Sequence, residues 1–86
     1  MPNLSKQLNL SNKTTIYPNP TNDLLHISCP VTYFDFIEIA DLAGEIHFLK
    51  KNVQEKTIPV ASLTSGIYII RIGINNEIIN QKVIKE

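Results

Sequence analysis

The residues in this sequence that could act as a nucleophile and its base are one cysteine, Cys29, and two histidines, His26 and His47. A cysteine nucleophile needs a base within hydrogen-bonding distance of its sulfur. His26 and Cys29 fall in what reads as a strand, where an odd separation sends two side chains to opposite faces. They cannot share a proton there, so we expect no catalytic residues and no enzyme activity.

Metal binding is the second chemistry that these residues raise. The two histidines could meet on an outer face, but the sequence shows no third ligand for them and no Cys/His cluster of the zinc-binding kind. We therefore interpret both as solvated surface residues. Four carboxylates fall at turns or at outward strand positions: Asp23, Asp35, Asp41 and Glu45. They are expected to accept local backbone hydrogen bonds. The prediction is no metal site and no cofactor, with calcium or glycan binding left open.

Charge and size exclude several classes of function. The chain of 86 residues has 8 Lys+Arg against 8 Asp+Glu, and its longest run of like charge is Lys50–Lys51. Nucleic acid is excluded as a partner, because its phosphates require a basic stripe. No stretch approaches the roughly 18 apolar residues of a membrane span, so no membrane insertion is expected. The N-terminus carries no apolar export signal, which leaves a cytosolic protein or a piece of a longer exported one.

Composition changes near residue 16. Residues 1–15 are mostly polar with isolated leucines, and we predict a flexible linker or tether there, with a short helix as the alternative. From Ile16 onward, apolar alternation is interrupted by turn residues about every 8 to 12 positions, the spacing of small sandwiches and barrels. We predict a single all-β domain over residues 16–86, with six or seven short antiparallel strands.

Two hairpins are predicted from turn residues. Asp41 and Gly44 suit positions i and i+3 of a type I turn within residues 34–50. Asn75 and Asn76 tolerate positive φ and suit a two-residue turn between the last two strands. The alternation then assigns one face to the core: Ile27, Ile37, Ile39, Ile46, Phe48, Leu63, Tyr68, Ile70 and Ile72.

The outer face of the last hairpin is unusually apolar. The predicted register sets Ile67 opposite Ile84 and Ile69 opposite Lys82. A lone soluble domain has little reason to display such a mixed apolar and cationic strip. We therefore interpret this strip as a surface that a partner recognises.

The aromatic residues are open to two interpretations. Tyr68 is either a core residue with its hydroxyl at the rim, which we favour, or a ring that stacks on a ligand. Phe34 and Phe36 share a face opposite Ile37 and Ile39, and they form either a partner patch or packing beneath a loop.

Two prolines enclose Asn19. Pro18 and Pro20 fix their own φ and push the residues before them toward extended conformations. The simplest interpretation is that they hold the end of the tether extended before the first strand.

Four motifs together resemble a known family. The segments YPNPTNDLLHI, IEIADLAGEI, LTSGIYIIRI and the terminal KVIKE occur in the order and spacing of the C-terminal sorting domain of type IX secretion cargo in Bacteroidetes. The resemblance covers about residues 16–86. It is carried by these positions: Pro18, Asn19, Pro20, Asp41, Gly44, Leu63, Gly66, Tyr68 and Lys82. Ile69 and Ile84 join them as candidate recognition residues because they lie on the apolar outer strip.

The resemblance implies a small immunoglobulin-like β-sandwich that serves as a non-catalytic secretion signal. Its implied partners are an upstream passenger domain, the type IX outer-membrane translocon and a sortase-like cysteine peptidase that removes the signal. The passenger would cross the periplasm and be secreted or attached to the cell surface. The alternative function is an Ig-like adhesion or carbohydrate-binding module. The sequence does not identify the passenger, the cleavage site or the oligomeric state.

Overall fold

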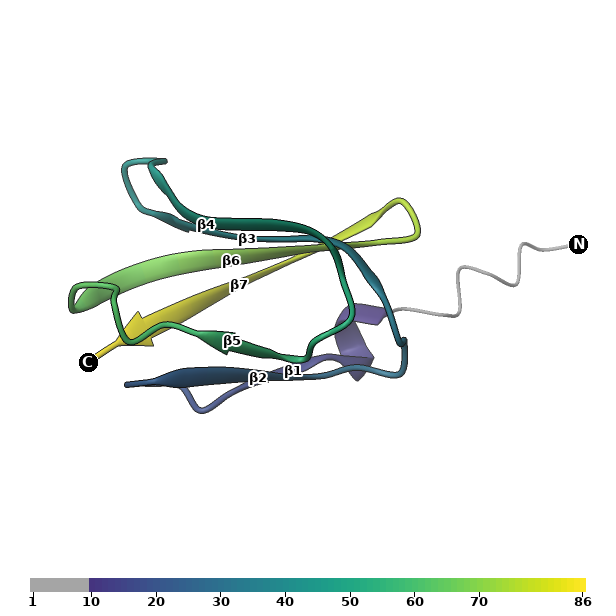
Figure 1. Ribbon diagram of the computed structural model, residues 1–86, viewed down its shortest axis with the longest axis horizontal. Coiled ribbons are helices and arrows are strands. Elements are labelled where there is room, and N and C mark those ends of the chain that lie inside the picture. The colour runs from purple at the N-terminus through teal and green to yellow at the C-terminus, as the bar shows by residue number, and fades with distance from the viewer. Residues whose placement is uncertain (1–9) are drawn as a thin grey trace, which may run out of the picture.

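Seven strands make up most of residues 10–86, the part of the chain that the computed structural model describes (Figure 1). In chain order they are β1 (Thr15–Tyr17), β2 (Leu24–Ser28), β3 (Phe34–Asp41), β4 (Ile46–Val53), β5 (Thr57–Pro59), β6 (Gly66–Ile74) and β7 (Glu77–Lys85). A short 3-10 helix, η2 (Leu10–Lys13), precedes them. Within these described residues, no helix is long and apolar enough to cross a membrane.

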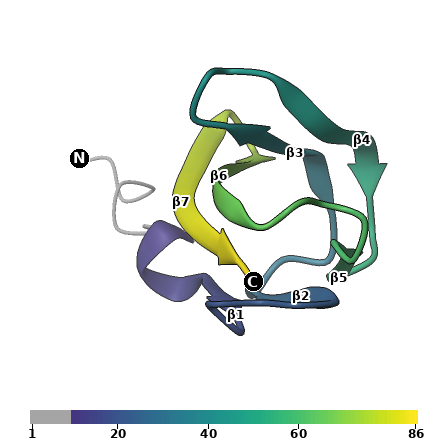
Figure 2. The ribbon, with the colours of Figure 1, turned by 90° about the vertical axis from the view of Figure 1, so that its left-hand side faces the viewer.

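The strands form two antiparallel sheets that pack face to face (Figures 1 and 2). One sheet has the order β1-β2-β5, and the other has the order β4-β3-β6-β7. In the letters used for immunoglobulin domains, strands β1 to β7 correspond to A, B, C, C′, E, F and G. The two sheets are then ABE and C′CFG, which is an immunoglobulin-like arrangement. The predicted small β-sandwich is confirmed.

One apolar core lies between the two sheets. Six of the predicted core residues are buried in it: Ile27, Ile37, Ile39, Tyr68, Ile70 and Ile72. Phe48 and Leu63 are partly buried and pack against it. The alternation of apolar residues therefore assigns most of the inner face correctly.

The prediction that Ile46 is buried is wrong, because β4 contains a bulge. Ile39 lies opposite Phe48 and Ala40 lies opposite Ile46, which leaves His47 as an extra residue between the two pairs. Successive residues of a strand point to opposite faces of the sheet. One extra residue therefore moves the side chains on the far side of the bulge to the face opposite the one that regular alternation predicts. Ile46 consequently lies on the outer face with Ala40, and it is 50% exposed.

The last hairpin follows the predicted register. The cross-strand pairs are Ile67 with Ile84, Tyr68 with Val83, Ile69 with Lys82, Ile70 with Gln81, Arg71 with Asn80, and Ile72 with Ile79. Asn75 and Asn76 form the turn, with φ of 49° and 67°. This left-handed conformation is the one that a type I′ hairpin turn requires.

Phe34 and Phe36 serve packing. Phe34 is fully buried in the core, whereas Phe36 is half-buried on β3. Phe36 lies opposite Gly73 of β6, and a Cβ added at Gly73 would collide with the Phe36 ring. The ring therefore fills the space that the missing side chain leaves. The interpretation as packing is supported over the interpretation as a partner patch.

The first strand precedes the two prolines, which corrects the predicted position of Pro18 and Pro20. Ile16 of β1 is buried and pairs with Ile27 of β2, so the prolines connect two strands. A strand of three residues is too short to show an alternation in the sequence. Of the predicted tether, residues 1–9 lie outside the described part of the chain, and Leu10 packs against the core.

Candidate functional site

The motif residues of four separate segments gather at one end of the sandwich. Asp41 at the end of β3 lies opposite Tyr68 of β6, which in turn lies opposite Val83 of β7. Asn19, from the β1–β2 connection, contacts β7 at the same level. This end also carries the last residues of β7, and it faces the viewer in Figure 2. We call it the motif end.

Asn19 binds the edge of the last strand through its side chain. Its carboxamide Nδ2 donates to the Lys82 carbonyl at 3.0 Å, and its Oδ1 accepts from the Ile84 amide at 2.9 Å. The side chain thus makes the donor and acceptor contacts that a neighbouring strand would make. Pro18 and Pro20, both preceded by cis peptide bonds, flank it and are exposed. Asn19 therefore covers part of the edge of β7.

Thr21 continues this contact toward the end of the chain. Its amide donates to the Ile84 carbonyl at 2.9 Å, and its carbonyl accepts from the Glu86 amide at 2.9 Å. Thr21 is 2% exposed, and its hydroxyl donates to the Leu24 carbonyl at 2.8 Å. The segment from Asn19 to Thr21 therefore joins the two sheets. Neither Thr21 nor the buried Lys85 beside it was assigned a role from the sequence, because no local pattern signals a contact so distant in the chain.

The predicted turn at Asp41 and Gly44 is confirmed. The Gly44 amide donates to the Asp41 carbonyl at 3.0 Å, and Gly44 adopts a φ of 93° that favours glycine. Asp41 Oδ1 accepts from the Ala43 and Glu45 amides, both at 2.9 Å. A hydrogen bond from His47 and these backbone amides holds the pKa of the Asp41 carboxyl below its usual value.

Tyr68 is a core residue with its hydroxyl at the rim. Its ring is 3% exposed, and its hydroxyl donates to the Thr64 carbonyl at 2.7 Å. A tyrosine near the start of this strand, bonded to backbone a few residues upstream, is the tyrosine corner of immunoglobulin-like domains. In the LxxGxY element, Leu63 packs against the core and Gly66 begins β6. These residues shape the domain, and the stacking interpretation of Tyr68 is not supported.

The predicted apolar strip lies on the outer face of the four-stranded sheet. Ile67 is 41% exposed and Ile84 is 39% exposed, and they lie opposite each other. In the next row, Ile69 is half-buried beside the exposed Lys82. The bulge places Ile46 on the same face: Ile46 lies opposite Ala40 of β3, and Ala40 lies opposite Ile69 of β6. We call the set Ile46, Ile67, Ile69, Lys82 and Ile84 the outer patch.

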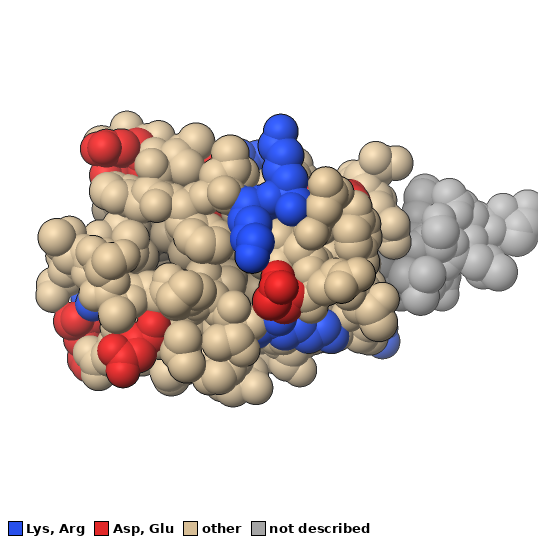
Figure 3. Space-filling view, viewed as in Figure 1, with Lys and Arg blue, Asp and Glu red and all other residues tan. Residues whose placement is uncertain are grey.

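Charges of both signs lie on the surface (Figure 3). Acidic side chains lie at the motif end in this view, and cationic side chains form a band across the middle of the molecule. Arg71 pairs with Glu38 at 3.4 Å, and Lys50 pairs with Glu55 at 3.5 Å. Because acidic side chains interrupt the cationic band and pair with its members, this face does not present the continuous basic stripe that phosphates require.

The histidines and the cysteine have separate partners. His26 lies in the three-stranded sheet and stacks on Tyr17, with ring centroids 5.3 Å apart. Cys29 is buried, and its sulfur accepts a hydrogen bond from the Thr14 hydroxyl at 3.1 Å. His47 lies in the other sheet and bonds to Asp41. Sequence reasoning did not find the group of Asp41, Glu45 and His47, because it assigned no bulge to β4.

These contacts define a class of protein. Two packed antiparallel sheets, ABE and C′CFG, together with a tyrosine corner at Tyr68, place the chain among the immunoglobulin-like β-sandwich domains. The chain belongs to the secretion system C-terminal sorting domain family, whose model matches residues 15–86. That match begins at Thr15, the first residue of β1.

A similar segment occurs in a larger protein. Over 75 residues the chain is 36% identical to beta-agarase D from Zobellia galactanivorans. This match covers 84% of the chain and 15% of the agarase. The chain thus spans less than one sixth of the length of that relative. The predicted identity as a type IX sorting domain is confirmed, and so is the predicted role as a secretion signal for secreted or surface-attached proteins.

Proposed function

We propose that this domain directs an upstream passenger through the type IX outer-membrane translocon, and that the translocon contacts the outer patch at the motif end. The observation that carries the proposal is the convergence of the family motifs around β7. Asn19 and Thr21 hold the strand, while Ile84 and Lys82 point away from the core. The patch is therefore presented by a fixed backbone.

The apolar content of the patch supports recognition by a protein. Ile46, Ile67 and Ile84 are each between 39% and 50% exposed. Ile67 and Ile84 lie opposite each other on β6 and β7, and Ile46 lies across β3 from Ile69 through Ala40. Contiguous exposed apolar side chains on a small soluble domain mark sites of protein contact. Lys82 adds one cationic group, which fits a partner surface that carries an acidic side chain beside an apolar one.

An export assay tests this proposal. A reporter with a signal peptide, fused ahead of the domain, is expressed in a host with type IX export. Ile69→Thr and Lys82→Glu should leave the reporter in the periplasm, while each purified domain keeps its melting temperature within a few degrees, because surface changes usually shift stability by about 0.5 kcal/mol or less. Ile78→Thr is the matched control, since Ile78 is 48% exposed at the opposite end of β7. Normal export of both patch variants would remove the patch from the recognition surface.

A second proposal concerns what happens to the domain after export. We propose that a sortase-like cysteine peptidase cuts within residues 1–15 and that the passenger is then attached to the surface or released. Because β1 begins at Thr15, a cut before that residue would leave every strand of the domain intact. Mass spectrometry of the exported passenger would locate its new C-terminus. A C-terminus within residues 16–86 would contradict this position.

Sugar binding remains the alternative function, and one exposed ring favours it. Tyr17 is 47% exposed on the outer face of the three-stranded sheet, where it stacks on His26. Aromatic rings of this kind can stack on sugars. A glycan array with the purified domain tests this alternative. Binding that Tyr17→Ala abolishes would support it, whereas an array without signal would exclude the glycans displayed.

A further inference from the structure

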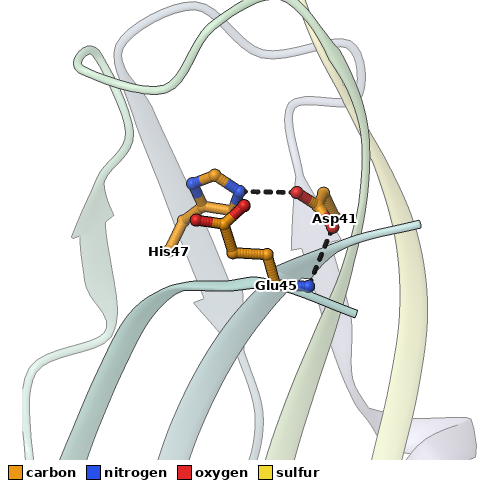
Figure 4. A group of neighbouring side chains, drawn as sticks. All are labelled: Asp41, Glu45 and His47. Carbon is orange, nitrogen blue, oxygen red and sulfur yellow. Dashed lines mark hydrogen bonds and ion pairs between the residues drawn. The ribbon is translucent and has the colours of Figure 1, made fainter. Parts of the chain in front are cut away.

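Three side chains with metal-ligating atoms meet beside the β3–β4 turn: Asp41, Glu45 and His47 (Figure 4). Their ligand atoms all lie within 4.8 Å of one another. Asp41 ends β3, Glu45 belongs to the turn, and His47 is the extra residue of the β4 bulge. Bulges frequently re-aim a side chain, and this one brings the His47 ring within bonding distance of Asp41.

We propose that Asp41, Glu45 and His47 form a binding site for a divalent zinc ion. One imidazole nitrogen and two carboxylate oxygens are a donor set that zinc accepts when a water molecule completes the coordination. Calcium is a poorer fit, because it takes six to eight oxygen ligands and does not favour imidazole. The donor types therefore distinguish this site from the calcium turn that the acidic residues alone could form.

The Asp41 carboxylate is already oriented as a ligand. Its Oδ1 accepts from the Ala43 and Glu45 amides, which leaves Oδ2 directed at His47 Nε2, 2.8 Å away. Hydrogen bonds that fix one oxygen of a carboxylate orient the other toward a metal.

Small movements would make room for the ion. Ligand atoms of a tetrahedral zinc with bonds of about 2.0 to 2.2 Å lie about 3.3 Å apart. Asp41 Oδ2 and His47 Nε2 would therefore separate by about half an ångström. Nε2 would give up the proton that it donates to Asp41, and the neutral ring, protonated at Nδ1 instead, would bind zinc through the Nε2 lone pair. Glu45 is exposed, and its long side chain can rotate to close the third contact.

The charges also favour a cation. The carboxylate oxygens of Asp41 and Glu45 and a ring nitrogen of His47 all lie within 4.8 Å of one another, so both negative charges would attract a cation bound among them. Among the described residues, the Glu45 carboxylate makes no hydrogen bond or ion pair. The Glu45 oxygens can therefore bind an ion without breaking a contact that the structure describes.

Zinc chloride titrated into the 86-residue chain by isothermal calorimetry tests the proposal. The expected result is one zinc ion per chain, with Glu45→Gln and His47→Gln each weakening binding at least tenfold. Glu77→Gln is the matched control, because Glu77 lies beside the turn at the opposite end of the sheet and should leave binding unchanged. The Glu45 side chain carries no described fold contact, so Glu45→Gln decides the outcome even if His47→Gln folds poorly.

A second readout identifies the ligating ring. In NMR spectra, zinc should shift the imidazole signals of His47 and leave those of His26 in place. Absence of zinc binding to the parent chain would overturn the proposal, and so would equal binding by the parent and Glu45→Gln. Tighter binding of calcium than of zinc would also overturn it. The site does not depend on the export function, because every measurement uses the purified chain without the secretion machinery.

Discussion

The two ends of the four-stranded sheet are built in different ways. At one end, Asn75 and Asn76 close a hairpin between strands that are adjacent in the chain. At the motif end, Asn19 and Thr21 bond to Ile84, so residues from the beginning and the end of the domain meet. A local turn closes the first end, whereas the second end combines a local turn at Asp41 and Gly44 with contacts that span almost the whole domain.

This difference has a consequence for recognition. A local hairpin can form early and by itself, whereas contacts between distant segments form only after the loops between them close. A partner that reads the motif end therefore reads a surface that is complete only in the folded domain. A sorting signal built in this way would report that folding is complete, which the hairpin at the opposite end could not do.

A substitution in the core should destabilise both ends of the sheet together. Ile70 is fully buried and lies opposite Ile39 in the centre of the sheet. Ile70→Ala should lower the free energy of unfolding by about 2 to 5 kcal/mol, because it leaves a cavity that the core fills only in part. Thermal denaturation measures the loss, and amide exchange should quicken at both ends together. Loss of protection at one end alone would show that the ends fold independently.

Removal of the Asn19 side chain should affect the motif end alone. Asn19→Ala deletes two hydrogen bonds to β7 and should cost about 1 to 3 kcal/mol. The Ile84 amide should exchange faster, while the amides near Asn75 should keep their rates. Asn22→Ala is the control, since Asn22 is exposed in the same connection. Equal effects of the two variants would contradict the role of Asn19.

The tyrosine corner should contribute less. Tyr68→Phe keeps the buried ring but removes the hydroxyl that donates to the Thr64 carbonyl, and it should cost about 0.5 to 1.5 kcal/mol. Tyr33→Phe provides a comparison, because the Tyr33 hydroxyl bonds to the Asn52 side chain on an exposed surface. Urea denaturation should rank Tyr68→Phe as the more damaging change. The reverse ranking would mean that the hydroxyl of Tyr68 does not anchor this corner.

Local signals explain which parts of the fold the sequence predicts. The register of the last hairpin follows from an Asn-Asn turn and from long alternation, which leave few other pairings. The bulge at His47 has no such signal, because the apolar residues on either side of it, Ile46 and Phe48, fit a regular strand equally well. β1 was not predicted for a related reason, because a strand of three residues is too short to show a periodic pattern.

In the candidate site, too, local features could be predicted from the sequence and distant contacts could not. The turn of Asp41 and Gly44 is local and could be predicted, because both residue types have a defined place in a turn. The contacts of Asn19 and Thr21 with β7 depend on how two sheets pack, and no spacing in the sequence encodes them. The family resemblance therefore singled out Pro18, Asn19 and Pro20, while the contacts of Asn19 and Thr21 with β7 became visible only in the fold.

The smallest expected effect is a dependence of stability on pH that arises at the motif end. Hydrogen bonds from His47 and from backbone amides lower the pKa of Asp41 in the folded state below its ordinary value of 3.8. A group with a lowered folded pKa adds stability above its unfolded pKa, and that stability is lost as pH falls through the folded pKa. The contribution of Asp41 should therefore be constant above about pH 5 and should disappear below the folded pKa.

Urea denaturation of the parent, Asp41→Asn and His47→Gln between pH 2 and 7 would measure this contribution. Asp41→Asn keeps the side-chain oxygen that accepts from the Ala43 and Glu45 amides, so the turn should still form. The stability difference between the parent and Asp41→Asn should shrink as the solution becomes acidic. His47→Gln should weaken this dependence, because the His47 hydrogen bond is the largest cause of the shift. A difference that stays constant down to pH 2 would show that the Asp41 carboxylate does not stabilise the motif end through its charge.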